Sequence, residues 1–122
     1  MSFDWSHYLD LAQDLFRQAA NSPYEDAYLR SAISRAYYAT YHKARLRLYN
    51  KWGISVPADA SAHSAVRKEF WQKNHKQIAA TLDRMRIDRN RADYTDSIAN
   101  LATTARENIK RANQVISVLS KL

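Results

Sequence analysis

The segment RNRADY, residues 89–94, places two arginines, an aspartate and a tyrosine in six consecutive positions. An apolar stripe with helical spacing runs before it through Ile78, Leu82 and Met85. Arg89 lies four residues further and therefore points to the same side of the predicted helix. Because a guanidinium stays charged, burying it is costly without an anion or a hydrogen-bond acceptor. We expect Arg89 to line a cleft or to pair with an acid.

The neighbouring acids keep the second option open. Asp88 and Asp93 flank Arg89, and the preceding long helix also carries carboxylates. In that case Arg89 forms a structural salt bridge, and Arg91 is simply solvated. Spacing alone does not decide between an ion pair and a ligand site.

A second group of functional side chains lies in the segment SRAYYATYHKARLRLY. Spacings of three and four place four of them on one polar, aromatic helix face: Arg35, Tyr38, His42 and Arg45. Arginine can bind phosphate, and a base can stack on tyrosine. The alternative is that Tyr37, Tyr38 and Tyr41 are packing residues, with their rings in the bundle or in a dimer seam and their hydroxyls at its rim.

The four histidines do not form a metal-binding motif. His63 and His75 are twelve residues apart, His7 and His42 are remote, and neither a His-Glu-x-x-His sequence nor an acid cluster accompanies them. The chain also lacks cysteine and a glycine-rich phosphate loop, and no serine lies in a nucleophile motif. We expect neither a metal nor another cofactor, and the common enzyme classes are excluded.

Helices must position these residues, because the 122-residue chain has one glycine, two prolines and no convincing period-two alternation. The expected helices cover residues 4–20, about 23–52, a short segment after Ser61, a segment from about Asn74 to the RNRADY motif, and a last one from Thr95 or Asp96 to about Lys121. Asp4, Ser22, Ser61 and Asn74 are the expected caps of the first four. We predict one domain, residues 1–122, folded as an all-α, up-and-down antiparallel bundle of four long helices and one short helix.

Helical spacing also predicts which residues face the core. In the first helix they are Tyr8, Leu11, Leu15, Phe16 and Ala19. In the second they are Leu29, Ile33, Ala36, Tyr37, Thr40, Ala44 and Leu48, and Gly53 ends that helix. In the last they are Ile98, Leu101, Ala102, Ala105, Ile109, Ala112, Ile116 and Leu119.

The charge balance favours a polyanionic partner. Nineteen lysines and arginines oppose twelve acids and give a net charge of +7. The first residues carry acids instead of a basic leader, and no run of eighteen apolar residues occurs. We therefore expect no signal peptide, no membrane partner and a cytoplasmic location.

Three segments, SAISRAYYATYHKARLRL, AHSAVRKEF and LDRMRIDRNRADY, together resemble the HEPN domain family of prokaryotes over residues 5 to about 120. The most specific pieces are SRAYYATYH and RNRADY, and the spacing of His63 and Phe70 adds weaker support. The resemblance implies a helical bundle, often a homodimer, frequently encoded beside a small nucleotidyltransferase partner. Many members of the family are metal-independent ribonucleases of toxin-antitoxin or defence systems, and others bind nucleotides or RNA without cleaving them.

The motif departs from the active family pattern, in which an arginine is followed after four to six residues by a histidine and two such pairs meet at a dimer cleft. Arg89 and Asn90 match the pattern, but Tyr94 stands where the histidine is expected. RNA cleavage without a metal needs a base for the 2'-OH, an acid for the leaving oxygen and positive charge at phosphorus. Tyrosine, with a reference pKa of about 10, is a poor base at pH 7. His42 can replace the histidine if its helix face borders the same cleft.

Three functions follow from these residues. The preferred one is RNA or nucleotide binding, with Arg89, Arg91 and Arg35 on phosphate, Tyr94 and Tyr38 against ribose or base, and Asp93 in the same site. The second is an active ribonuclease toxin in which Arg89 is essential and Tyr94 or His42 carries the proton. The third is a dimeric interaction module without catalysis. The family pairing also suggests Tyr94 as the acceptor of a nucleotide from the transferase.

Overall fold

Five helices make up the computed structural model, which describes residues 2–122. They are α1 (Ser6–Ala19), α2 (Glu25–Trp52), α3 (Ala62–Gln72), α4 (Lys76–Tyr94) and α5 (Leu101–Leu119). The described part of the chain contains no strand. The all-α class and the helical bundle predicted from the sequence are confirmed. In residues 2–122, no helix combines the length and the apolarity that crossing a membrane requires.

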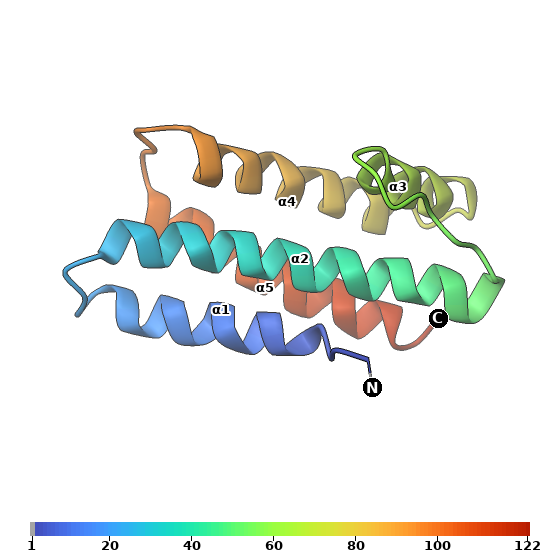
Figure 1. The fold of residues 1–122 in the computed structure, drawn as a ribbon, viewed down its shortest axis with the longest axis horizontal. Helices are drawn as coiled ribbons and strands as arrows, with labels where there is room; N and C mark the ends of the chain where they lie inside the picture. Colours follow the sequence, from blue (N-terminus) through green and yellow to red (C-terminus); the bar gives the residue numbers. More distant parts are fainter. Residues whose placement is uncertain (1) are drawn as a thin grey trace.

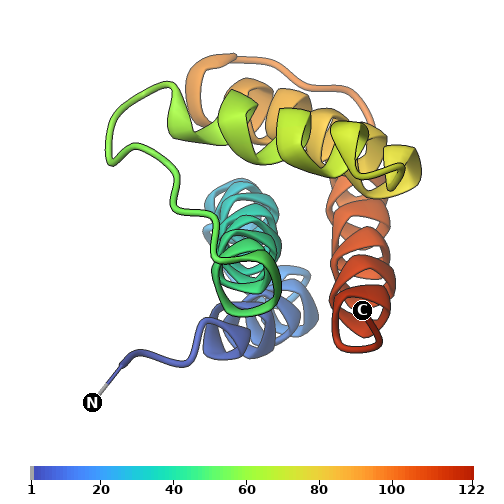
Figure 2. The same cartoon turned by 90° about the vertical axis from the view of Figure 1, so that its right-hand side faces the viewer.

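The longest helix, α2, lies at the centre of the bundle. It has 28 residues and contacts each of the other four helices. In Figure 1, α1 lies along one side of α2 and α4 along the other, while α5 passes behind α2. Figure 2 shows α3 and α4 together as a layer above α2 and α5. Side chains on different faces of α2 therefore meet different helices.

The predicted core stripe of α2 is confirmed. All seven of its residues are buried: Leu29, Ile33, Ala36, Tyr37, Thr40, Ala44 and Leu48. Ala32, Ala39 and Tyr41 are buried as well, because α2 has neighbours on more than one side. Four alanines of α2 have no exposed surface, and their small size lets the neighbouring helices approach closely.

The first two helices begin later than predicted. α1 begins at Ser6, and its N-cap residue is Trp5 instead of Asp4. The Asp4 carboxylate still accepts hydrogen bonds from the backbone N–H of Ser6 (3.0 Å) and from its hydroxyl (2.7 Å). α2 begins at Glu25, because the Ser22 hydroxyl accepts the backbone N–H of Tyr24 (3.0 Å) in a turn before the helix.

The caps predicted for α3 and α4 also differ in detail. Ser61 is the N-cap residue of α3, but its side chain donates to Asp59 (2.5 Å) instead of capping the helix. Asn74 does not cap α4. It has a φ of 67° and lies in the turn that ends α3, where the N–H of His75 donates to the carbonyl of Phe70 (2.8 Å).

The start of α5 was predicted wrongly. Neither Thr95 nor Asp96 begins this helix, which starts at Leu101. Arg30 of α2 donates hydrogen bonds to the carbonyls of Ala92 (2.8 Å), Thr95 (2.6 Å) and Asp96 (2.9 Å). These bonds between residues distant in sequence hold the chain in a non-helical connection after α4.

Two predicted core positions are wrong. Ile98 lies in the connection before α5, but it is half-buried and packs against the core as predicted. Ala102 is exposed, and Leu11 of α1 is 42% exposed. Each of these helices contacts the bundle along a narrower face than its apolar pattern predicts.

A buried polar pair joins α4 to α5. Asp88 is 3% exposed and Asn108 is completely buried, and the Asn108 amide donates to the Asp88 carboxylate at 3.0 Å. Arg84 and Arg111 lie 3.5 and 3.8 Å from the same carboxylate oxygen. Asp88 is therefore directed toward α5, and the predicted option of an ion pair with Arg89 is wrong for this acid.

We predict that Asn108→Ala lowers the free energy of unfolding by about 1–3 kcal/mol, because it removes the shortest hydrogen bond to a buried carboxylate. Chemical denaturation measures this change. Asn113→Ala is the matched control on the same helix, since Asn113 is exposed and its amide bonds only to the Ile109 carbonyl (3.1 Å). Equal losses in the two variants would show that the Asp88 contact does not stabilise the fold.

Candidate functional site

Arg89 lies on the face of α4 that packs against α2. Its side chain is 14% exposed, and the centre of its guanidinium lies 5.5 Å from the ring centroid of Tyr37 and 5.4 Å from that of Tyr38. The buried Nε has no hydrogen-bond partner. Asp93, one helical turn later, is the acid it meets, at 3.4 Å. Arg89 therefore points inward and also pairs with an acid, so the two options predicted from the sequence occur together.

The Tyr37 hydroxyl reaches a histidine from another helix. Its oxygen lies 2.5 Å from Nδ1 of His63, in the first turn of α3. Burial raises the pKa of Tyr37 above its ordinary range, against the opposing positive charges of Arg89 and Arg67. The hydroxyl therefore stays protonated at neutral pH and can donate to Nδ1. A neutral imidazole that accepts at Nδ1 carries its own hydrogen on Nε2.

His63 is held between aromatic rings and positive charges. The Tyr41 ring stacks on it with centroids 4.1 Å apart. Burial, followed by the charges of Arg89, Arg67 and Arg86, lowers the pKa of His63. The imidazole is therefore neutral at pH 7, and these arginines disfavour a second proton on it.

His42 of α2 lies beside this group. Its ring stacks on Trp5 with centroids 3.6 Å apart, and its Nδ1 accepts a hydrogen bond from Arg45 (3.2 Å). Burial lowers the pKa of His42 to about 4, and the charges of Arg45 and His63 act in the same direction. The Tyr41 ring borders both imidazoles, since its centroid lies 4.9 Å from that of His42 and 4.1 Å from that of His63.

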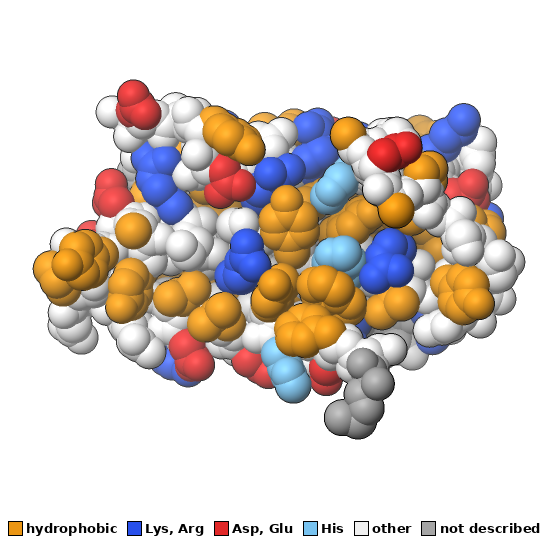
Figure 3. Space-filling view, in the orientation of Figure 1, with side chains coloured by type: hydrophobic (Ala, Val, Ile, Leu, Met, Phe, Trp, Pro, Cys, Tyr) orange, Lys and Arg blue, Asp and Glu red, His pale blue; other side chains and the backbone are white. Residues whose placement is uncertain are grey.

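We call this surface the arginine–histidine face. Its residues are Arg35, Tyr37, Tyr38, Tyr41, His42, Arg45, His63, Arg67 and Arg89. Figure 3 shows histidines, basic side chains and hydrophobic side chains adjoining one another over α2 and its neighbours. Arg35 belongs to it through Tyr38, whose ring centroid is 5.6 Å from the guanidinium, and Tyr8, at 4.6 Å.

The RNRADY motif is divided between sides of its helix. Arg89 and Asp93 are one turn apart on the same side of α4, where Arg89 packs against α2 and Asp93 is exposed. Arg91 is exposed, and Tyr94, at the end of α4, is 80% exposed. Asn90 is half-buried beside them. The structure therefore brings Arg89 and Asp93 together with Arg35, Tyr38 and His42, but leaves Arg91 and Tyr94 on another side.

His63 and Arg67 are the residues that sequence reasoning missed. The segment AHSAVRKEF was noted for its resemblance, but its position against α2 depends on the path of the loop between α2 and α3. Tyr37, predicted to pack in the core, is also the hydrogen-bond partner of His63. A histidine four residues before an arginine at the start of a helix was the available signal, because both point to one side.

Searches with family models, against curated proteins and against solved structures found no match to this chain. Arginines provide positive charge, the tyrosines provide ring faces, and two neutral imidazoles lie within the same group. Such a group can hold a phosphate beside an aromatic base or ribose.

We predict that Trp5→Ala raises the pKa of His42 from about 4 toward 6.5, because the indole shields the imidazole from water. NMR titration of the histidine ring protons measures this pKa. The unfolded chain takes up this proton near pH 6.5, so acidification from 6.5 to 4 should lower the free energy of unfolding, and less steeply in Trp5→Ala.

Trp71→Ala, at an exposed indole on α3, is the matched control for the removal of a tryptophan. It should leave the His42 titration unchanged. A His42 pKa that stays near 4 in Trp5→Ala would show that stacking on the indole is not what keeps this ring neutral.

Proposed function

We propose that this protein is a HEPN-like RNA- or nucleotide-binding protein and that the arginine–histidine face is its binding site. The observation that carries the proposal is the position of Arg89. Its guanidinium is mostly buried against two tyrosine rings, its Nε lacks a partner, and the carboxylate of Asp93 is only a 3.4 Å contact. A phosphate oxygen would provide a stronger, charge-assisted hydrogen bond to such a group.

The surrounding side chains support a nucleotide as the source of that phosphate. The guanidinium groups of Arg35 and Arg89 both lie near the Tyr38 ring, at 5.6 and 5.4 Å from its centroid. A base or ribose can pack against tyrosine while arginines bind the phosphate. The net charge of +7 favours the same class of ligand through counterion release.

The resemblance to the HEPN family completes the proposal. From it we also propose that the long helices run up and down and that the protein forms a homodimer. Its role would be in a toxin-antitoxin or defence system, beside a small nucleotidyltransferase. The exposure of Tyr94, 80%, meets the condition for accepting a nucleotide from such a partner, because its side chain is open to solvent. Arg91, exposed on the same last turn of α4, places a positive charge on the side of the helix that carries Tyr94.

We predict that Arg89→Gln combined with Arg35→Gln weakens binding of a labelled single-stranded RNA at least tenfold, since each substitution removes a charge-assisted contact. Fluorescence anisotropy at fixed salt measures the Kd. Arg17→Gln combined with Arg106→Gln is the matched control, because it removes the same charge from α1 and α5. Equal losses of RNA affinity in both double variants would show that only the net charge of the protein matters.

Tight binding that neither double variant changes would contradict the proposed site. That result would favour the third function, a dimeric interaction module in which the tyrosines of α2 are packing residues. Measurement of the mass in solution by light scattering tests the homodimer separately from RNA binding.

A metal-independent ribonuclease is the second candidate function. Two neutral imidazoles favour it: His63, which is affected by the charge of Arg89, and His42, which lies beside Tyr38. One imidazole, His63 or His42, would first give up the hydrogen bond that its Nδ1 accepts from Tyr37 or Arg45. That nitrogen would then remove the proton from the ribose 2'-OH, and the 2'-oxygen would attack phosphorus. The bond to the 5'-oxygen would break, and an acid would protonate that leaving oxygen. Arg89 would stabilise the charge on the phosphorane. In this version a histidine from α3 or α2 replaces Tyr94 as the proton carrier.

We predict for this second function that the protein cleaves RNA in excess chelator, leaving 2',3'-cyclic phosphate ends. His63→Gln should reduce the rate at least 100-fold with little change in RNA affinity, which is the usual size of a general acid–base contribution. His75→Gln, at the junction of α3 and α4, is the control. RNA that stays intact with the parent protein would eliminate the ribonuclease and leave the binding function.

A further inference from the structure

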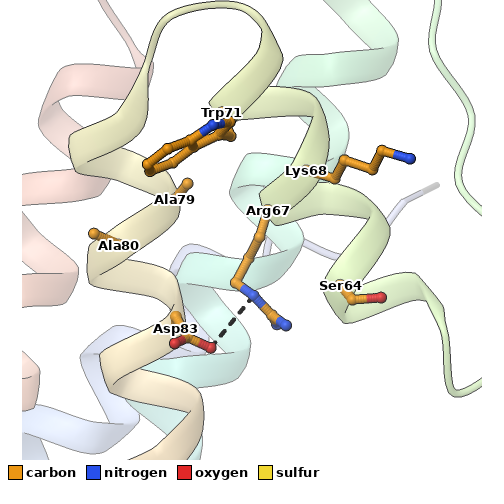
Figure 4. Close-up of a pocket in the computed structure, with 7 residues that line it drawn as sticks. All are labelled: Ser64, Arg67, Lys68, Trp71, Ala79, Ala80 and Asp83. Carbon is orange, nitrogen blue, oxygen red and sulfur yellow. Dashed lines mark ion pairs between the residues drawn. The ribbon is translucent and has the colours of Figure 1, made fainter.

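A groove of about 440 Å³ runs between α3 and α4, next to the arginine–histidine face. Its lining residues are Ser64, Arg67, Lys68, Trp71, Ala79, Ala80 and Asp83. Figure 4 shows the indole of Trp71 over Ala79 at one end and Arg67 directed toward Asp83 at the other. The volume lies within the usual range for small-ligand sites, and the lining exposes more apolar than polar surface.

Trp71 gives this groove an exposed aromatic wall. The residue is 54% exposed although tryptophan is usually well buried. Two small side chains, Ala79 and Ala80, lie opposite the indole and leave room for a flat ring. Lys76 places its ammonium over the indole, 4.9 Å from the ring centroid, and a base that stacks on that face would displace this flexible side chain. Lys68 extends outward at the rim. An open aromatic surface with cations around it is the kind of platform on which nucleic-acid bases stack.

Arg67 connects the groove to the arginine–histidine face. Its Nε lies 3.4 Å from the Asp83 carboxylate, which forms the end of the groove. Arg67 lies one helical turn after His63 on α3, so the two side chains share one side of that helix. Its Nη1 is buried and has no hydrogen-bond partner. One arginine thus borders both sites, and a ligand that extends from Arg89 along α4 reaches the groove next.

We propose that this groove is a base-binding subsite for a second nucleotide, and that the ligand of the protein is single-stranded RNA instead of a mononucleotide. The proposal rests on the proposed function of the arginine–histidine face. A phosphate at Arg89 and Arg67 leaves the neighbouring base free to stack on Trp71. In a duplex both faces of a base are already stacked on its neighbours, so only an unpaired base can enter.

The test compares two ligands, a labelled six-nucleotide single-stranded RNA and a mononucleotide, in their binding to the 122-residue chain. Trp71→Leu should weaken binding of the oligonucleotide about tenfold and leave binding of the mononucleotide within about twofold, because base stacking on one aromatic side chain contributes roughly that factor. Tyr24→Leu is the matched control, since Tyr24 is 68% exposed and lies at the turn between α1 and α2. Circular dichroism confirms that both variants are folded.

An NMR titration of the parent protein gives a second readout that needs no substitution. The indole N–H signal of Trp71 should shift when the oligonucleotide is added and stay in place with the mononucleotide. If Arg89→Gln weakens RNA binding but Trp71→Leu does not, and the Trp71 signal stays in place, the subsite is wrong and the proposed function stands. If the parent binds neither ligand, the proposed function itself fails.

Discussion

The contact of Arg89 with the tyrosines of α2 is the interaction on which the rest of the site depends. The guanidinium lies against Tyr37 and Tyr38, at 5.5 and 5.4 Å from their ring centroids, and the ring faces partly offset the cost of removing it from water. Tyr37 in turn binds His63 through its hydroxyl, at 2.5 Å. One tyrosine therefore joins α2, α3 and α4 and fixes the arginine and the imidazole relative to each other.

This arrangement requires a central helix with small side chains on some sides and large side chains on others. Ala32, Ala36 and Ala39 have no exposed surface, so the helices beside α2 can approach its backbone closely. That approach lets Trp5, just before α1, stack on His42 at 3.6 Å. A larger residue at the alanine positions would separate the helices and open this contact to water.

Period and spacing predicted the parts of the fold that depend on local sequence. The buried stripe of α2 and the inward position of Arg89 were both correct, because a helix places every third or fourth residue on one side. The start of α5 was not predictable in this way, since Arg30 holds the preceding connection through bonds to carbonyls more than sixty residues away. The motif was also misleading in one respect. The motif was expected to form one site because its residues are consecutive, but a helix directs Arg91 and Tyr94 away from Arg89.

The position of the imidazole depends on a single loop. Gly53 ends α2 with a φ of 68°, a conformation that residues with a Cβ adopt only with strain, and the N–H of Ile54 donates to the carbonyl of Leu48 (3.2 Å). This turn directs the chain back over α2 and so brings His63 to Tyr37. No pattern within the RNRADY motif contains that information. The fold instead brings His63, a residue distant in sequence, into the same group of side chains as Arg89.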